Sequence, residues 1–227
     1  MPCRSKKLWR NRFFPSISPT RLVVFLRLAT FLPGVWCSLY LSGCVNADRD
    51  HKILVSVADQ RMVLFDKNQP VASWLISTSK FGTGDRPGSY ATPLGRLVVV
   101  SKIGTDAPSG AVFHNRHWTG EIVRPNAPGR DPIVSRILWL KGTEAQNRDA
   151  YQRTIYIHGT PEESKIGTPA SYGCIRMKSN DVIALYKQIG VGADVEITNA
   201  HLPGNLIPSL IPSPAAPDNQ AAGTGGE

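Results

Sequence analysis

Acidic residues are absent from the first 43 positions of this 227-residue sequence. Seven of the 26 lysines and arginines lie there, which leaves 19 basic and 17 acidic residues after position 43. The formal charge of +9 therefore belongs largely to the N-terminal segment, and the remainder carries about +2. No concentrated basic stripe follows, so the composition argues against nucleic-acid binding.

The sequence also lacks an uninterrupted apolar run long enough to span a membrane. Its most apolar stretch, "LATFLPGVWCSLYLSGC", ends at Cys44 and is broken by Pro33 and Gly34. It holds roughly fifteen apolar residues, whereas a membrane-spanning helix needs about twenty. A basic segment followed by an apolar run of this length is typical of an export signal. We therefore predict a signal peptide over 1–43, with an uncleaved anchor as the alternative.

Two cleavage patterns overlap at the end of this segment. Leu41 to Cys44, "LSGC", resembles a bacterial lipobox, in which the cysteine becomes lipidated after cleavage before it. Val45 and Ala47 also satisfy the small-residue rule of an ordinary signal peptidase. The lipobox implies an exported lipoprotein on the periplasmic side. Because valine rather than aspartate follows Cys44, resemblance to Gram-negative lipoproteins favours the outer membrane. The alternative is a soluble periplasmic protein.

Cysteine is scarce, with four in the whole chain. Cys3 and Cys37 leave with the leader, and Cys44 is lipidated or lost. Cys174 then has no intramolecular disulfide partner, unless the protein dimerises through it. A buried structural thiol and a nucleophile remain as its possible roles.

Short β-branched runs separated by glycine- and proline-rich loops dominate the segment from 51 to 199. They predict a mainly β domain, a sandwich or barrel, over that range. One helix is expected from an N-cap at Ser179 to a stop at Gly190, with apolar residues at helical spacing. Residues 200–227, rich in proline, alanine and glycine, are predicted to form a flexible tail. The strands are expected at 52–59, 61–66, 71–78, 95–102, 135–142, 153–160 and 193–199.

His158 and Cys174 are the candidate catalytic pair. His158 ends the run "TIYIHGT", and Cys174 follows a loop and precedes the predicted helix. A thiol with a pKa near 8.5 is only a few per cent ionised near pH 7, and an adjacent imidazole can take its proton. The Gly159 carbonyl can fix the imidazole tautomer. The backbone amides of Tyr172, Gly173 and Cys174 are candidate donors to an oxyanion.

The motifs around this pair resemble the L,D-transpeptidase catalytic domain of the YkuD type. "IHGT" followed by "SYGCIRM" carries Ser171, Gly173, Cys174 and Arg176 at the family's positions. "VSVADQRMVLFD" resembles its opening hairpin, and "ISTSKFGTGDRPGSYATPLGRLVV" its following segment. The resemblance covers about 51–199. It implies an enzyme of cell-wall biogenesis and cell shape.

Three features depart from the family pattern. Tyr172 stands where many members carry a second histidine, and Ser79 where glycine is common. Residues 113–151 look like insertions around the cleft. Arg176 is expected either to bind a substrate carboxylate or to brace its loop, and bracing is the expected role of Ser171. His114 and His117, in "HNRH", have a metal-like spacing but no completing ligands, so neither a metal nor a cofactor is expected.

The resemblance implies that Cys174 attacks an L-to-D peptide bond of a peptidoglycan stem tetrapeptide and forms a thioester. An amine acceptor then forms a cross-link, or a lipoprotein lysine is attached. If water resolves the thioester, the enzyme is an L,D-carboxypeptidase or endopeptidase. Carbapenem-type inhibitors are expected to acylate Cys174. The rival from another class is a non-catalytic wall-binding lipoprotein.

Overall fold

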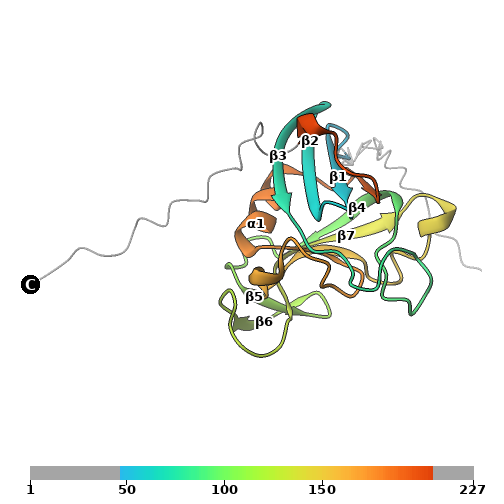
Figure 1. The fold of residues 1–227 in the computed structure, drawn as a ribbon. Helices are drawn as coiled ribbons and strands as arrows, with labels where there is room; N and C mark the ends of the chain where they lie inside the picture. The colour runs from blue at the N-terminus through green and yellow to red at the C-terminus, as the bar shows by residue number, and fades with distance from the viewer. Residues whose placement is uncertain (1–46, 207–227) are drawn as a thin grey trace, which may run out of the picture. The chain divides into compact units, whose positions relative to one another are not determined.

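The computed structural model describes residues 47–206, which form one curved β-sheet with a single α-helix (Figure 1). The signal peptide, the lipobox and Cys44 lie outside the described residues. No helix in the described range is long and apolar enough to cross a membrane. The strands are β1 (His51–Ser56), β2 (Arg61–Asp66), β3 (Gln69–Leu75), β4 (Gly95–Ile103), β5 (Ala111–His114), β6 (His117–Ile122), β7 (Ile133–Gly142), β8 (Tyr156–Gly159), β9 (Ile175–Met177) and β10 (Asp194–Thr198).

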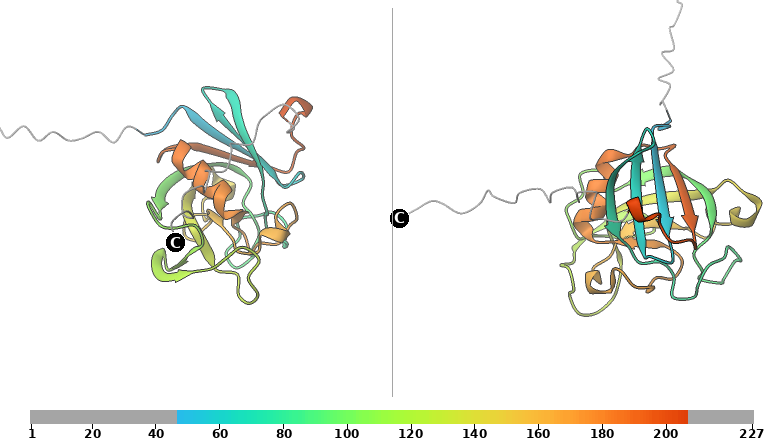
Figure 2. Two further views of the ribbon diagram at one scale, coloured as in Figure 1. Left: turned by 90° about the vertical axis from the view of Figure 1, so that its left-hand side faces the viewer. Right: turned by 45° about the horizontal axis from the view of Figure 1, so that its top comes forward.

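The sheet runs in the order β3-β2-β1-β10-β4-β7-β5-β6, and β7 also pairs with β8, which pairs with β9. The segment after β3 then returns to β9. Ser77 and Arg176 exchange both backbone hydrogen bonds, at 2.9 and 2.8 Å. These bonds close the sheet on itself, so the predicted barrel-like, mainly β fold is confirmed; Figure 2 shows its curvature.

Alternation along the first strands defines the core. Ile53 and Val55 of β1 are fully buried, whereas Lys52 is exposed and Leu54 is half-buried. The main apolar cluster collects inward residues from β1 to β4, β7 to β10 and the helix. β7 runs through the middle of the sheet, paired with β4, β5 and β8. The prediction that 113–151 is insertion is therefore wrong for β7, which contains the strand expected at 135–142 and lies between three partner strands.

The helix α1 (Ser179–Gln188) packs on β7 and β8 through its buried apolar residues. The predicted N-cap was wrong. Lys178 occupies that position without a side-chain cap, and the Ser179 amide donates to the Glu163 carboxylate at 2.8 Å. A distant carboxylate thus replaces the local serine oxygen. Gly190 follows the helix end as predicted, and a Cβ there would come within 2.9 Å of the Asp48 side chain.

The predicted flexible tail does not begin at residue 200. Leu202 and Leu206 pack on Val63, which lies on the outer face of β1 and β2. The Leu202 amide donates to Asp59 at 2.6 Å. Docking this segment covers apolar side chains on the outer sheet face that water would otherwise contact. The rest of the predicted tail, 207–227, lies outside the described residues.

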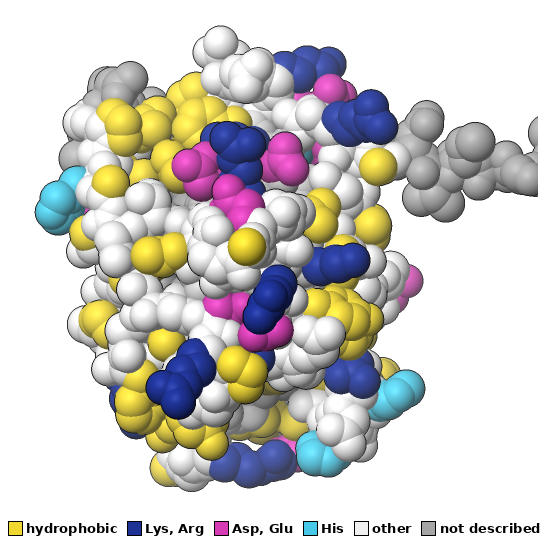
Figure 3. Space-filling view, turned by 90° about the vertical axis from the view of Figure 1, so that its right-hand side faces the viewer, with side chains coloured by type: hydrophobic (Ala, Val, Ile, Leu, Met, Phe, Trp, Pro, Cys, Tyr) yellow, Lys and Arg dark blue, Asp and Glu magenta, His cyan; other side chains and the backbone are white. Residues whose placement is uncertain are grey.

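Charge is mixed rather than segregated on one face of the domain. In the face drawn in Figure 3, lysine and arginine side chains lie beside aspartate and glutamate side chains. This pattern agrees with the small net charge of the sequence after position 43.

Candidate active site

Parallel pairing of β8 and β9 brings the two predicted catalytic residues to one face. His158 lies opposite Arg176, and Cys174 immediately precedes β9, two positions before Arg176. Side chains two positions apart share a strand face. The spacing of paired strands puts the Cα atoms of His158 and Cys174 roughly 8 Å apart, which their side chains can bridge.

The burial pattern of the two strands agrees with this assignment. Ile157 and Ile175 belong to the main core, on the other face of the pair. Tyr156 and Cys174 instead pack into a second apolar cluster with Ile137. Alternation along β8 then puts His158 on the same side as Tyr156 and Cys174.

The imidazole of His158 is buried and fixed by its own strand. Its side chain is 5% exposed, and Nδ1 donates to the Gly159 carbonyl oxygen at 2.8 Å. Burial lowers its pKa to about 4, partly offset by this hydrogen bond. The ring is therefore neutral at pH 7, and with Nδ1 protonated, Nε2 carries the lone pair of a base.

The Cys174 thiol is half-buried and donates to the Thr154 carbonyl oxygen at 3.5 Å. Burial raises its pKa to about 11, against the opposing effects of the Tyr156 amide and nearby arginines. Both candidate groups are thus neutral at pH 7, a thiol and an imidazole, and do not form a thiolate–imidazolium ion pair. Such a thiol becomes a nucleophile only when the imidazole takes its proton as it attacks.

Gly159 and Gly173 are both required, because neighbouring backbone atoms lie close to each of them. A Cβ at Gly159 would lie 2.6 Å from the Val134 carbonyl oxygen of β7. Gly173 adopts φ +118°, a conformation that L residues rarely occupy, and a Cβ there would lie 3.2 Å from the Ala91 carbonyl oxygen. Larger residues would separate β8 from β7 or push the cysteine loop away from its neighbours.

Ser171 holds the cysteine loop together. Its hydroxyl is fully buried, donates to the Cys174 carbonyl oxygen at 2.6 Å and accepts from the Gly173 amide at 3.2 Å. Of the three predicted oxyanion donors, the Gly173 amide is therefore engaged within the loop. Within 47–206, no acceptor takes a hydrogen bond from the amides of Tyr172 or Cys174.

Arg176 is committed to protein carboxylates. Its guanidinium lies 2.5 Å from Asp131 and 3.3 Å from Glu162, and its side chain is only 9% exposed. Asp131 also accepts from the Thr160 hydroxyl at 2.5 Å. Of the two roles expected for Arg176, this geometry provides bracing, because both carboxylates already occupy its donors.

The histidine pair of "HNRH" lies at a hairpin turn. His114 ends β5 and pairs with His117, which begins β6, and the two residues between them have positive φ. This is the backbone of a two-residue hairpin loop. Within the part of the chain that the structure describes, no group of three histidine, cysteine or carboxylate side chains is arranged to hold a metal ion.

Comparison with known proteins identifies the domain. The model of the YkuD family, described as the L,D-transpeptidase catalytic domain, matches residues 50–197. This chain belongs to that family. Two homologues named L,D-transpeptidase are similar to this domain. YqjB of Bacillus subtilis is 41% identical over 37% of the chain and 45% of its own length. YkuD of Bacillus licheniformis is 27% identical over 71% of the chain and 74% of its own length.

Solved L,D-transpeptidase structures are also similar, at low identity. LdtMt1 in complex with imipenem has a TM-score of 0.42 at 16% identity, over 66% of this chain and 59% of that one. L,D-transpeptidase 3 from Mycobacterium tuberculosis with a faropenem-derived adduct has a TM-score of 0.44 at 16% identity, over 66% and 60%. The match thus spans less than two thirds of YqjB and of these solved chains.

Thr92, in the L,D-transpeptidase motif "T-P-x-G", supports the cysteine loop. Thr92 is fully buried, and its hydroxyl donates to the Gly173 carbonyl oxygen at 3.1 Å. The Thr92 hydroxyl oxygen in turn accepts from the Ser79 amide at 3.0 Å. The sequence showed that this segment belongs to the family pattern, but not that its threonine touches the cysteine loop.

A buried ion pair that the sequence did not reveal anchors the same region. Arg153 lies 2.7 Å from Asp85, with side chains 9% and 5% exposed. Arg153 also donates to the Ala91 carbonyl oxygen at 2.6 Å and precedes Thr154, the acceptor of the Cys174 thiol. Local sequence could not reveal this partner of Asp85, because it lies 68 positions away.

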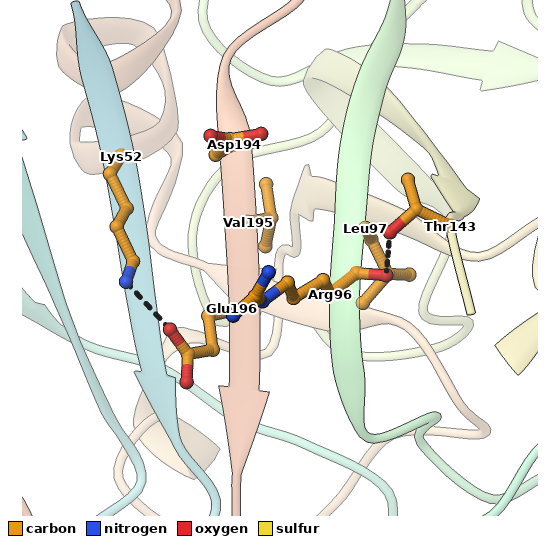
Figure 4. Close-up of a pocket in the computed structure, with 7 residues that line it drawn as sticks. All are labelled: Lys52, Arg96, Leu97, Thr143, Asp194, Val195 and Glu196. Carbon is orange, nitrogen blue, oxygen red and sulfur yellow. Dashed lines mark hydrogen bonds and ion pairs between the residues drawn. The ribbon is translucent and has the colours of Figure 1, made fainter. Parts of the chain in front are cut away.

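A hollow of about 320 Å³ lies elsewhere in this L,D-transpeptidase domain, over β1, β10 and β4 (Figure 4). Lys52 and Glu196 form an ion pair of 2.6 Å across it, and Arg96 extends over β10. No cysteine or histidine lines the hollow. The candidate catalytic pair therefore lies at β8 and β9, and not in this hollow.

Proposed function

We propose that this domain is a cysteine-dependent L,D-transpeptidase acting on peptidoglycan stem tetrapeptides. The observation that carries the proposal is the neutral thiol–imidazole pair on one face of β8 and β9. The hydrogen bond from Nδ1 of His158 to the Gly159 carbonyl oxygen leaves Nε2 as the base. Family membership supports the reaction class.

In the first step Sγ of Cys174 attacks the carbonyl carbon of the L-to-D peptide bond. The thiol proton passes to Nε2 of His158, and the carbonyl oxygen gains negative charge near the amides of Tyr172 and Cys174. The carbon–nitrogen bond then breaks. His158 returns the proton to the leaving amine, so that the D-residue departs and a thioester remains.

In the second step an acceptor amine attacks the thioester carbon and gives its proton to His158. The carbon–sulfur bond breaks, and the thiolate recovers the proton from the imidazole. A stem-peptide amine yields a cross-link, and a lipoprotein lysine yields an anchored protein. Water in place of the amine gives the L,D-carboxypeptidase reaction.

Mass spectrometry of a reaction with purified disaccharide-tetrapeptide tests this function. We expect wild-type protein to form dimer with an added stem-peptide acceptor, and Cys174→Ala protein to form neither dimer nor thioester. Circular dichroism should show that the variant is folded. Activity that survives in Cys174→Ala would refute the mechanism, and tripeptide without dimer would favour the hydrolase.

An inhibitor adduct gives a second readout of the same nucleophile. Two relatives were solved with imipenem and with a faropenem-derived adduct. By analogy we expect a carbapenem to raise the intact mass of wild-type protein by one adduct on Cys174. No adduct should form on Cys174→Ala.

We further propose that the protein is exported and anchored on the periplasmic side by lipid on Cys44, with the outer membrane favoured. "LSGC" and the small net charge beyond it support lipid attachment over electrostatic binding. Cys44→Ser should release the protein or stall its processing, as seen by fractionation and mass analysis of the mature N-terminus. A soluble protein that begins at Asp48 would instead mean cleavage after Ala47.

A further inference from the structure

Three exposed aromatic side chains cluster beside the nucleophile loop. Phe81, Tyr90 and Tyr172 are 51%, 57% and 55% exposed, and we call them the aromatic cluster. Their ring centroids lie 5.5 to 5.9 Å apart. Tyr172 is two residues from Cys174, and the Tyr90 carbonyl oxygen would lie 3.5 Å from a Cβ at Gly173. Exposed apolar patches of this kind mark binding sites more often than single exposed residues do.

The backbone holds the aromatic cluster in place. The Ser79 hydroxyl donates to the Tyr90 carbonyl oxygen at 2.5 Å and accepts from the Phe81 amide at 3.0 Å. Ser79 also pairs with Ser171, the neighbour of Tyr172. Tyr90 adopts φ +56°, which a non-glycine residue rarely does without support. Ser79 thus connects Phe81 and Tyr90 through its hydroxyl, and its backbone bridge to Ser171 brings in Tyr172.

Two departures from the family motif meet at this cluster. Ser79 replaces the common glycine, and Tyr172 replaces a frequent histidine. A glycine at 79 would lose both hydroxyl hydrogen bonds to the aromatic cluster. The residues that distinguish this chain therefore build one surface, next to Cys174.

Lys80 is the cation of this surface. Its ammonium donates to the Tyr172 hydroxyl at 3.0 Å and lies 4.3 Å from the centroid of that ring and 5.3 Å from that of Phe81. No carboxylate in the described part of the chain forms an ion pair with it. Arg176, by contrast, already binds two carboxylates.

We propose that Lys80 and Tyr172 form a subsite that binds a carboxylate of the substrate peptide, with the aromatic cluster as its floor. This inference rests on the proposed function. The terminal carboxylate of the donor lies within one residue of the bond that Cys174 attacks, which makes it the first source. A carboxylate of the acceptor peptide is the second source of the same chemistry.

The stereochemistry suits a carboxylate. An ammonium has three donors, and the phenol that accepts from one of them can still donate its own proton. Two donor atoms 3.0 Å apart can therefore address the two oxygens of one carboxylate. The hydrogen bond from Lys80 lowers the pKa of Tyr172, which makes its hydroxyl a stronger donor.

The donor arm of the test measures single-turnover acylation of Cys174 by intact mass, without acceptor. The substrates are the tetrapeptide and its C-terminal amide. Wild-type protein should prefer the free acid, and Lys80→Ala and Tyr172→Phe should each lower kcat/KM for the acid by about tenfold. The rate with the amide should not change, so the preference should disappear. Added salt should reduce the wild-type preference, because the site is exposed.

The acceptor arm measures how the preformed thioester divides between amine and water. If the carboxylate belongs to the acceptor, amidation of the acceptor should lower the dimer yield in wild type but not in Lys80→Ala. Lys187→Ala, on an exposed position of α1, is the matched control for loss of one positive charge. It should behave as wild type in both arms.

Equal effects of Lys80→Ala on acid and amide substrates in both arms, or no effect in either, would overturn the subsite. If neither peptide acylates Cys174 of the wild-type protein, the proposed function fails, and the subsite is tested separately. Folded Cys174→Ala protein is then titrated with acetylated tetrapeptide and its amide, followed by intrinsic fluorescence. Tighter binding of the acid that depends on Lys80 supports the subsite, and equal binding of both refutes it.

Discussion

Arg176 and Lys80 lie on two sides of the same cysteine loop and differ in almost every physical respect. The Arg176 side chain is 9% exposed and bound by Asp131 and Glu162. Lys80 is exposed and lies over aromatic rings, with a phenol as its hydrogen-bond partner. A buried charge must be paired to be tolerated. Arg176 therefore belongs to the buried, paired residues that hold the cysteine loop, which we call the frame. The exposed ammonium keeps its water and can exchange it for a ligand.

The same contrast separates the reacting groups from the frame that holds them. Two buried arginines near the cysteine loop are paired with carboxylates, Arg153 with Asp85 and Arg176 with Asp131. The catalytic groups instead remain neutral, with the His158 pKa at about 4 and the Cys174 pKa at about 11. Desolvation disfavours the charged form of an unpaired group, and it is the largest cause of both shifts. The buried side therefore sets geometry, and in the proposed mechanism proton transfer to His158 generates the nucleophile.

The largest expected effect tests whether His158 is that proton acceptor or a part of the frame. His158→Ala should lower the acylation rate by about two to four orders of magnitude, the usual range for a lost general base. The wild-type rate should be level from about pH 6 to 8 and fall as the imidazole gains its proton towards pH 4, since only the neutral ring accepts. Single-turnover mass spectrometry across pH measures both.

A matched control is His114→Ala, at the hairpin turn, which should retain the wild-type rate. A loss below threefold in His158→Ala would make that residue structural. A wild-type rate that falls with an apparent pKa near 6.5 would contradict the desolvated, neutral pair, because it would indicate an imidazole with ordinary hydration.

A smaller effect is expected on stability, where loss of Arg176 can be compared directly with loss of Lys80. Arg176→Met leaves Asp131 and Glu162 without their partner and should lower the free energy of unfolding by about 3 kcal/mol. Lys80→Met removes an exposed charge and should change it by less than about 0.5 kcal/mol. Urea denaturation of both variants, at matched slopes, measures the difference. Equal losses would mean that Lys80 also belongs to the frame.

Local pattern was enough to predict most strands and the helix. Runs such as 61–66 and 95–102 carry β-branched residues between loop signals, and the apolar spacing after Ser179 predicts α1. β9 was missed because three residues carry no periodicity of their own. It forms because β8 and the segment at Ser77 offer it hydrogen bonds on both sides.

Contacts between distant residues account for the other errors. The segment at 200–206 resembles a tail by composition, yet Leu202 and Leu206 find an apolar sheet face at Val63. Ser179 resembles a cap, yet Glu163 takes the amide of the first turn. Neither outcome can be derived from neighbours in the sequence, because both depend on which surface the fold brings near.

The sequence by itself determined the strand-rich domain, the helix and the pairing of one histidine with one cysteine. Residue types and short periods carry that information. Only the tertiary structure decided that both catalytic groups are neutral, that Arg176 is occupied and that Lys80 is available. These properties depend on desolvation and on charge partners far apart in the chain, such as Asp131 for Arg176 and Asp85 for Arg153. Folding sets both, because burial and long-range pairing exist only once the sheet has closed.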